Sequence, residues 1–206
     1  MLDVETGLRQ RKKARTRRAL ADAAMLLFAE RGYEETTVAD LAAAVDIAPR
    51  TFFSYFPAKE DVLFADIDDR IAALAQLELR QPGEPLVDAT RRMAGQLVEQ
   101  VLWDSGDEQA EVRQRIIERQ PSLQAAMLLR LRAADQMLTG RLQAAYPDQL
   151  DEVLAAAVVG AFTSALRTVA AATPGRRPST GEAQEVIGRV VRLLEHGLGA
   201  DRRDLV

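Results

Sequence analysis

Apolar side chains recur three and four residues apart through most of the chain, which is the spacing of amphipathic α-helices. The first such segment ends at Arg31-Gly32-Tyr33, and a much shorter one follows, with Thr37 as a candidate N-cap and Asp46 just beyond its last apolar residue. A third segment begins near Pro49 and stops at Pro57. The pattern predicts one longer helix followed by two short ones.

The two short helices are separated by about four residues, a spacing that makes residues 37–56 a helix-turn-helix candidate. Isolated helices of this length are marginal in water, so they must be held by packing. Apolar residues at suitable positions are Phe28, Val38, Leu41, Ile47, Phe52 and Phe56. We therefore expect a three-helix domain over residues 12–58.

Longer helical patterns fill the remainder of the chain. The first is expected from Lys59 to about Leu79, and the others at 86–103, 107–119, 122–146, 149–172 and 180–198. Proline and glycine account for their boundaries, as in Thr173-Pro174-Gly175. The expected fold is all-α with about nine helices, in which residues 59–206 form a C-terminal helical domain.

The segment 149–172 is apolar on two faces, so a helix there needs two packing partners. Segment 180–198 begins with a capping box and repeats the apolar pattern. We expect these two helices to pair with their copies in a homodimer; a buried hairpin within one chain is the alternative. The candidate interface residues are Leu154, Val158, Ala161, Phe162, Ala165, Val169, Ile187, Val190, Val191 and Leu194.

The composition narrows the class of protein. Aromatic residues make up 5% of the chain, there is no cysteine, and His196 is the one histidine. Disulfides, thiolate nucleophiles and Cys- or His-rich metal sites are therefore not expected, and neither is a cofactor. The start of the chain lacks the apolar core of a signal peptide, and the run Val153–Leu166 is too short to span a bilayer. These features favour a cytoplasmic protein with no membrane partner.

Positive charge is concentrated near the N-terminus although the net charge is −4. A dense local basic patch is what phosphate binding requires, and residues 1–11 are expected to be a flexible basic arm. Taken alone, the run could equally be a solvated tail. The basic residues of this stretch are Arg9, Arg11, Lys12, Lys13, Arg15, Arg17 and Arg18.

Residues 17–66 resemble the N-terminal DNA-binding domain of the TetR family of bacterial regulators. Three motifs carry the resemblance in order: Leu27-Phe28-x-x-Arg31-Gly32-Tyr33, Thr36-Thr37-Val38, and Thr51-Phe52-Phe53-x-Tyr55-Phe56 followed by Lys59-Glu60. The match covers about a quarter of the chain. Some features also resemble an actinobacterial subgroup of the family.

The resemblance implies that the third helix enters the major groove of double-stranded DNA. Arg50 is the leading candidate for base recognition, because a guanidinium can bond guanine bidentately. Thr37, Tyr55 and Lys59 are expected to bind phosphates, and Phe53 to touch a thymine methyl group. The full set of candidate DNA contacts is Arg11, Lys12, Lys13, Arg15, Thr37, Pro49, Arg50, Thr51, Phe53, Ser54, Tyr55 and Lys59.

Three positions depart from the family pattern. Asp46 stands where the tight turn usually has glycine, which is tolerable because aspartate visits the left-handed region at modest cost. Ala48 replaces the usual serine N-cap of the third helix, and Phe53 replaces a frequent tyrosine. Contacts through hydroxyl groups at positions 48 and 53 are therefore not expected.

The resemblance further implies that residues 59–206 form a ligand-binding and dimerisation domain. It also implies a homodimeric repressor that leaves an inverted-repeat operator when a small-molecule inducer binds, an acyl-type compound being one candidate. Activation of transcription and non-specific architectural DNA binding are the alternatives. An enzyme is not expected, since His196 has no catalytic partners and Asp66, Asp68 and Asp69 are predicted to form a solvated acidic face. Candidate ligand-binding residues, each of which could equally be ordinary core, are Met93, Leu97, Trp103, Ile116, Met127, Leu131, Met137 and Phe162.

Overall fold

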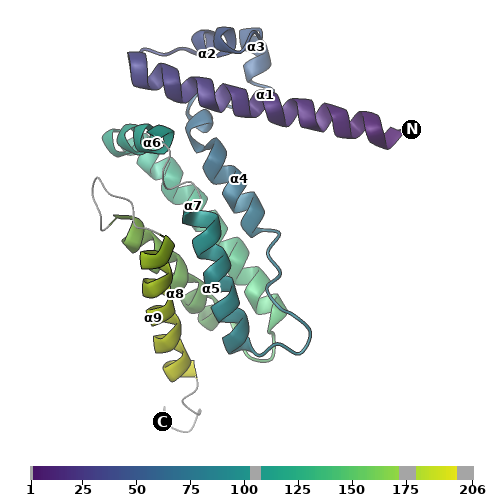
Figure 1. Cartoon of the computed structure of the whole chain (residues 1–206), viewed down its shortest axis with the longest axis vertical. Helices are drawn as coiled ribbons and strands as arrows, with labels where there is room; N and C mark the ends of the chain where they lie inside the picture. The colour runs from purple at the N-terminus through teal and green to yellow at the C-terminus, as the bar shows by residue number, and fades with distance from the viewer. Residues whose placement is uncertain (1, 103–107, 172–179, 199–206) are drawn as a thin grey trace. The chain divides into compact units, whose positions relative to one another are not determined.

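The computed structural model describes residues 2–102, 108–171 and 180–198, and within these ranges it contains helices and no strand (Figure 1). The all-α prediction is confirmed. The elements are α1 (Leu2–Arg31), α2 (Val38–Ala44), α3 (Pro49–Phe52), the 3-10 helix η1 (Glu60–Phe64), α4 (Ala65–Leu74), α5 (Leu86–Leu102), α6 (Glu108–Arg119), α7 (Pro121–Ala145), α8 (Glu152–Ala171) and α9 (Thr180–Leu198).

The first helix is longer than the sequence pattern suggested, because α1 already begins at Leu2 and includes the segment expected to be a flexible arm. No proline interrupts this stretch. The helix ends at Gly32, which has a φ of 91° and donates its N–H to the Phe28 carbonyl at 3.0 Å. Glycine adopts this left-handed conformation without steric cost, which explains the predicted stop.

The helix expected from Lys59 to Leu79 is instead a 3-10 turn, η1, followed by the shorter α4, which ends at Leu74. Arg141 of α7 donates to the carbonyl oxygens of Leu74 and Leu77, at 2.9 and 2.5 Å. These side-chain bonds satisfy carbonyls at the end of the helix, so the chain can leave the helix here without burying unpaired acceptors.

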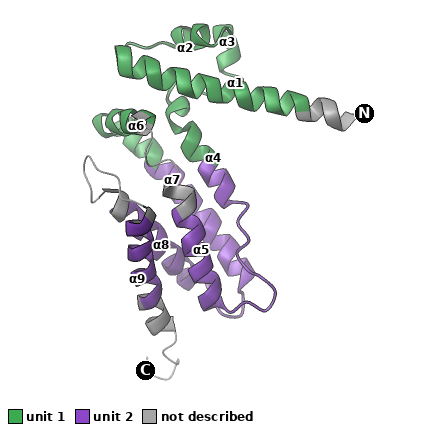
Figure 2. Cartoon of the chain, viewed as in Figure 1, with its two compact units in different colours: residues 1–69, 107–127 green, residues 70–106, 128–206 purple. Residues whose placement is uncertain are grey.

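The chain forms two compact units (Figure 2). Unit 1 comprises Met1–Asp69 and Asp107–Met127, and unit 2 comprises Arg70–Gly106 and Leu128–Val206. These units divide the chain within α4 and again within α7, and the predicted domains 12–58 and 59–206 stay a prediction. Helix α6 and the start of α7 belong with the helix-turn-helix, because Ile117 and Leu123 are buried in the same core as α1.

The core of unit 1 is built around the helix-turn-helix. Phe28, Leu41, Phe52 and Phe56 are each at most 3% exposed, as expected for residues that hold short helices together. Val38 and Ile47 are partly buried against the same cluster. Packing against α1 thus provides the stability that α2 and α3 lack on their own.

The core of unit 2 lies among α5, α7, α8 and α9, and α9 contacts both α5 and α8. Its members include Met93 and Val98 of α5, Phe162 of α8, and Ile187 and Val191 of α9, each at most 4% exposed. Among the helices that the structure describes, none is long and apolar enough to cross a membrane.

Candidate nucleic-acid interface

Helix α2 begins with a complete capping box. The Thr37 hydroxyl oxygen accepts from the Asp40 N–H at 3.2 Å, while Asp40 Oδ2 accepts from the Thr37 N–H at 2.9 Å. Asp40 Oδ2 also accepts from the Thr37 hydroxyl. These bonds, the hydroxyl first, lower the pKa of Asp40 below its usual value. Thr37 is exposed, yet its hydroxyl proton already has an acceptor, so its first role is to start α2.

Thr37→Ala is expected to destabilise the protein by about 1 kcal/mol, the usual cost of losing an N-cap side chain. The lowered pKa of Asp40 means that the bonds accepted by its carboxylate add a separate contribution, which is present above the ordinary carboxyl pKa and is lost as the pH falls. Urea denaturation at pH 7 and at low pH measures both effects, with Thr168→Ala, an exposed position in the last turn of α8, as the control. Equal stability of wild type and Thr37→Ala at neutral pH would contradict the capping role.

The turn between α2 and α3 depends on Asp46, which has a φ of 55°. Sequence reasoning expected aspartate to tolerate the left-handed conformation here, and the structure confirms it. The turn closes when the N–H groups of Val45 and Ile47 donate to the Ala42 carbonyl at 3.3 and 3.0 Å. The chain is thereby reversed within a few residues, and α3 starts at Pro49.

Helix α3 is shorter than the predicted span to Phe56, since residues 53–55 form a turn. Its N-cap Ala48 makes no side-chain bond, as predicted from the loss of the usual serine. Phe52 is fully buried and anchors the helix, whereas the next side chain, Phe53, is 56% exposed. One side of this short element therefore packs into the core through Phe52, and the other side, which includes Phe53, is exposed.

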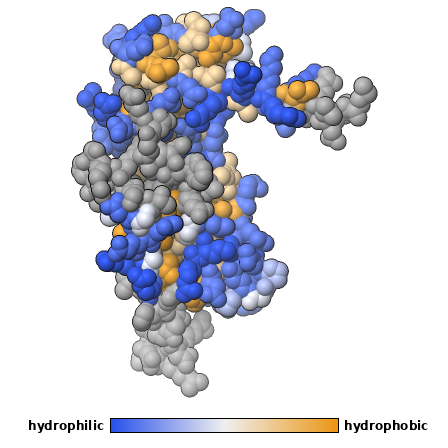
Figure 3. Space-filling model, in the orientation of Figure 1, coloured by the Kyte–Doolittle hydropathy of each residue, from blue (hydrophilic) through white to orange (hydrophobic). Residues whose placement is uncertain are grey.

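The exposed surface of this element contains most of the residues predicted to read bases. Pro49, Arg50 and Ser54 are exposed, whereas Thr51 and Tyr55 are half-buried. Within the described parts of the chain, Arg50 forms no ion pair. Its guanidinium therefore keeps its donors for an outside acceptor. On the face shown in Figure 3, apolar residues lie among hydrophilic ones over α2 and α3.

Lys59 has a different environment from the one predicted. Its ammonium donates to the carbonyl oxygens of Tyr33 and Thr36, at 2.8 and 3.1 Å, and lies 4.1 Å from the centre of the Tyr33 ring. Burial, followed by the charges of Glu60 and neighbouring carboxylates, raises the pKa of Tyr33 to about 12. Lys59 thus ties the start of η1 to the loop after α1, and phosphate binding is at most a second role.

The basic residues of α1 divide into two groups. Arg11, Lys12, Lys13 and Arg15 are all exposed, as a phosphate-binding surface requires. Arg17 and Arg18, by contrast, bind carboxylates of α4. In Figure 3 the exposed part of α1 toward the N-terminus is mainly hydrophilic. The structure therefore keeps the four residues singled out for DNA binding accessible.

Asp66 of α4 is the centre of an ion-pair network that sequence reasoning missed. Its Oδ1 accepts from Arg18 of α1 at 3.0 Å, and its Oδ2 from Arg113 of α6 at 2.5 Å. The Asp66 and Arg113 side chains are each 10% exposed. The acidic patch predicted to be solvated is thus partly buried. Only tertiary packing brings Arg113 to this carboxylate, because the two residues are 47 positions apart.

Arg17 adds a second connection from α1 to α4. Its guanidinium donates to Asp69 at 2.7 Å and lies 5.1 Å from the centre of the Phe56 ring. Since Phe56 belongs to the segment following α3, this one side chain touches three parts of unit 1. The scaffold that carries α3 is thus fixed by charges as well as by apolar packing.

The described members of the predicted ligand-binding set are divided between the two units. Met93, Leu97 and Phe162 are buried in the core of unit 2 with Met137 beside them, whereas Ile116 and Met127 pack against the core of unit 1. Leu131 is half-buried on α7, and Trp103 lies outside the described residues. The buried members are part of the apolar cores, and ligand binding by this set stays a prediction.

The predicted dimer interface stays a prediction, and part of it is buried within the chain itself. Val158, Phe162, Ile187 and Val191 are each at most 4% exposed because they pack inside their own chain. The remaining members are Leu154, at 36% exposure, the half-buried Ala161, Ala165 and Val190, and Val169 and Leu194, whose side chains lie outside the described ones. The apolar periodicity identified a buried face, and it could not distinguish that face from an exposed one.

A different face of α8 is apolar and exposed. Val153 is 78% exposed, and Ala157 and Ser164 are exposed on the same side with Gly160 half-buried between them. Val186 of α9 is 37% exposed. The sequence signal was present, since Val153, Ala157 and Ser164 recur at helical spacing, but small residues carry little weight in a hydrophobicity pattern.

Two family models together cover most of the chain. Residues 20–65 match the model described as bacterial regulatory proteins, tetR family, and residues 84–199 match the model of the MftR C-terminal domain. The second match alone extends over more than half of the chain.

Curated relatives are similar to large parts of the chain. The HTH-type transcriptional regulator TcmR of Streptomyces glaucescens is 39% identical over 141 residues, which cover 66% of this chain and 61% of TcmR. A predicted mycofactocin biosynthesis transcriptional regulator, MftR of Mycobacterium tuberculosis, is 32% identical over 116 residues, covering 56% and 58%. The match thus spans about three fifths of the length of each relative.

Solved structures share the fold. One assigned to the TetR family from Mesorhizobium loti has a TM-score of 0.58 at 17% identity and covers 90% of this chain and 97% of its own. The flavonoid-responsive regulator FrrA has a TM-score of 0.56 at 20% identity, with 89% and 97% covered. The helix-turn-helix, the two family models and the relatives agree: the chain belongs to the TetR family of bacterial regulatory proteins.

Proposed function

We propose that this regulator is a ligand-responsive repressor that binds an inverted-repeat operator as a homodimer in the cytoplasm. The observation that carries the proposal is the surface of α3. Arg50, Ser54 and Phe53 point away from a fully buried Phe52, so a rigid core presents polar and apolar groups to a partner. Base edges in a major groove offer the matching acceptors and methyl groups.

The basic face of α1 supports the same partner. Arg11, Lys12, Lys13 and Arg15 supply exposed cations in the same unit as α3. Such contacts with phosphates provide affinity and orientation, whereas the contacts from α3 provide sequence preference. Because Lys59 and Thr37 are engaged within the protein, most of the phosphate binding is assigned to α1.

The exposed face of α8 supports a homodimer. A stripe of Val153, Ala157, Gly160 and Ser164 allows two helices to approach closely, and Val186 of α9 adds apolar area. Two copies related by a two-fold axis would present two α3 helices to DNA, at half-sites about 34 to 36 Å apart or a related helical repeat. The operator is therefore an inverted repeat.

Release by a ligand follows from this geometry. A small molecule that binds better to one arrangement of the two α3 helices in the dimer shifts the population toward that arrangement. Bound DNA must then lower the affinity for that molecule by the same factor. Repression is the simplest outcome, since a bound dimer blocks access to the promoter. An activator would use the same contacts, and transcription from the target promoter in a deletion strain separates the two roles.

Footprinting followed by binding titration tests the proposal. Affinity for the protected inverted repeat should exceed that for random DNA by about a thousandfold or more at fixed salt. Arg50→Ala should lose about 1 to 3 kcal/mol of operator-binding free energy and relax the sequence preference at one base pair of each half-site. Lys13→Ala should weaken binding to all DNA sequences equally. Arg189→Ala on α9 is the control. A ratio near one between operator and random DNA would refute sequence-specific regulation.

A further inference from the structure

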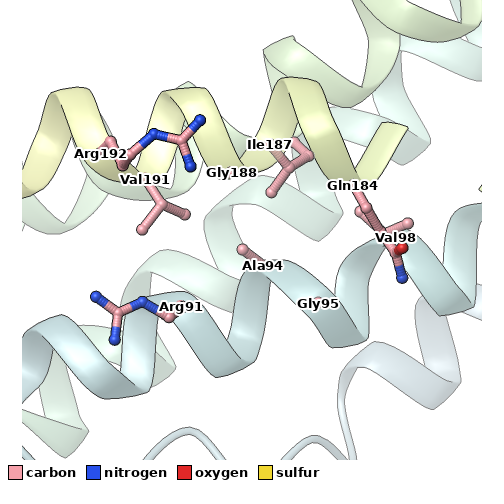
Figure 4. Close-up of a pocket in the computed structure, with 9 residues that line it drawn as sticks. All are labelled: Arg91, Ala94, Gly95, Val98, Gln184, Ile187, Gly188, Val191 and Arg192. Atoms are coloured by element: carbon pink, nitrogen blue, oxygen red, sulfur yellow. The ribbon is translucent and has the colours of Figure 1, made fainter. Parts of the chain in front are cut away.

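A groove lies between α5 and α9 in unit 2, with a volume of about 420 Å³ (Figure 4). Volumes of this size fall within the usual range of small-molecule sites, about 300 to 1,000 Å³. None of the residues predicted to bind a ligand lines it. Its lining residues are Arg91, Ala94, Gly95 and Val98 of α5, and Gln184, Ile187, Gly188, Val191 and Arg192 of α9.

The floor of the groove is apolar and already buried by the protein. Ala94, Val98, Ile187 and Val191 are each at most 4% exposed. Gly95 contributes no side chain, and a Cβ atom added there would meet nothing within 4 Å. The space is therefore open because small residues line α5, while the surrounding core remains closely packed. An apolar group entering the groove would meet carbon atoms of the floor and no unpaired polar group of these four residues.

Positive charge marks one end of the groove. Figure 4 shows the guanidinium groups of Arg91 and Arg192 at the same end, one from each helix, with Gln184 toward the other end. Arg91 donates to the exposed Asp88 at 3.1 Å, and such surface pairs contribute little and exchange readily. A guanidinium has five N–H donors, so both arginines can also bind an anionic group.

We propose that this groove binds an amphipathic anion, whose carboxylate, sulfonate or phosphate group contacts Arg91 and Arg192 while its apolar body covers Ala94, Ile187 and Val191. The proposal rests on the ligand-responsive function proposed above and assigns it a site and a ligand class. Because α9 contacts both α5 and α8, a molecule seated between α5 and α9 would act on the helix beside the proposed dimer face.

Anilinonaphthalene sulfonate and its uncharged parent, N-phenylnaphthylamine, form a matched pair of probes, because they differ only in the sulfonate. Fluorescence titration of the full chain with each probe measures the two contributions separately. Gly95→Leu should reduce the affinity for both probes about tenfold, since the new side chain occupies the groove. Gly140→Leu is the matched control on α7, because Cβ atoms at Gly95 and Gly140 both have open space. Both changes also favour the helix, so folding is preserved.

The charged end is tested by the double variant Arg91→Gln and Arg192→Gln. The double variant should lower the affinity for the sulfonate probe about tenfold or more. The affinity for the uncharged parent should stay within about twofold of the wild-type value, because only the anion makes charge-assisted hydrogen bonds. Arg189→Gln is the control on the same helix, since Arg189 is exposed and does not line the groove. Equal losses for both probes, or an effect of Gly140→Leu as large as that of Gly95→Leu, would overturn the proposal.

Sedimentation tests the other candidate occupant of the groove, which is a second copy of the chain. A dimer that dissociates in Gly95→Leu would place an interface in the groove and would also overturn the proposal. The ligand-responsive function fails separately, if operator binding of the wild type is unchanged by every amphipathic anion that saturates the groove. Probe binding and operator binding are measured independently, so the two failures are distinguishable.

Discussion

Asp66→Ala is expected to destabilise the protein by about 3 to 5 kcal/mol, the cost of breaking a buried ion pair by removing one partner. The Asp66 carboxylate bonds Arg18 of α1 and Arg113 of α6, and the Arg113 side chain is only 10% exposed. Removing the carboxylate leaves a buried guanidinium without that counter-charge. Guanidinium chloride denaturation measures the loss, provided that the transition of unit 1 is resolved.

Asp69→Ala provides the matched control. Asp69 also pairs with an arginine of α1, Arg17, but its side chain is 63% exposed. Exposed pairs are screened by water, so this variant should cost less than about 1 kcal/mol. Similar losses for Asp66→Ala and Asp69→Ala would show that burial does not strengthen the Asp66 network.

A double replacement separates charge from packing. Asp66→Leu combined with Arg113→Met removes both charges and keeps apolar volume, so it should recover much of the stability lost in Asp66→Ala. Its operator affinity is the informative readout, because Arg113 is the contact through which α6 reaches the carboxylate of α4. A stable variant with weakened operator binding would show that the Asp66 ion-pair network positions α3 for DNA binding.

Elements with strong local signals could be predicted from the sequence. The bounds of α9 match the expected segment 180–198, because its apolar period is regular in the sequence. Asp46 was expected to tolerate the left-handed conformation, and its φ of 55° agrees. Phe52 was assigned to the core and Phe53 to the surface, which the structure also shows. Each of these features depends on residues within a few positions of one another.

Features that depend on tertiary contacts were not predictable. Lys59 follows a recognisable motif, yet only the fold shows that its ammonium binds the carbonyls of Tyr33 and Thr36. Asp66 and Asp69 look alike in sequence, and only the position of α6 buries the first and leaves the second exposed. The same holds for α8, where Val153 faces outward and Val158 inward although both are apolar valines.

Ala157→Arg is expected to convert the proposed dimer into a monomer and to lower operator affinity by about a hundredfold or more. Ala157 is exposed on α8, so arginine fits the free protomer and keeps the helix, but two copies would bring like charges together. When a monomer binds one half-site, no second α3 helix is held next to the other half-site. The gain in affinity from linking the two binding events is therefore lost. Sedimentation measures the mass, and titration with the inverted repeat measures the affinity.

Ala133→Arg tests the competing surface with the same change of side chain. Ala133 is exposed on α7, where Leu128 and Leu129 are 66% and 68% exposed and form the other apolar surface that could pair two copies. If α8 forms the interface, Ala133→Arg remains a dimer with unchanged operator affinity while Ala157→Arg does not. The reverse result would assign the interface to α7. A single half-site separates dimerisation from recognition, because Ala157→Arg should bind it as wild type does, whereas Arg50→Ala should not.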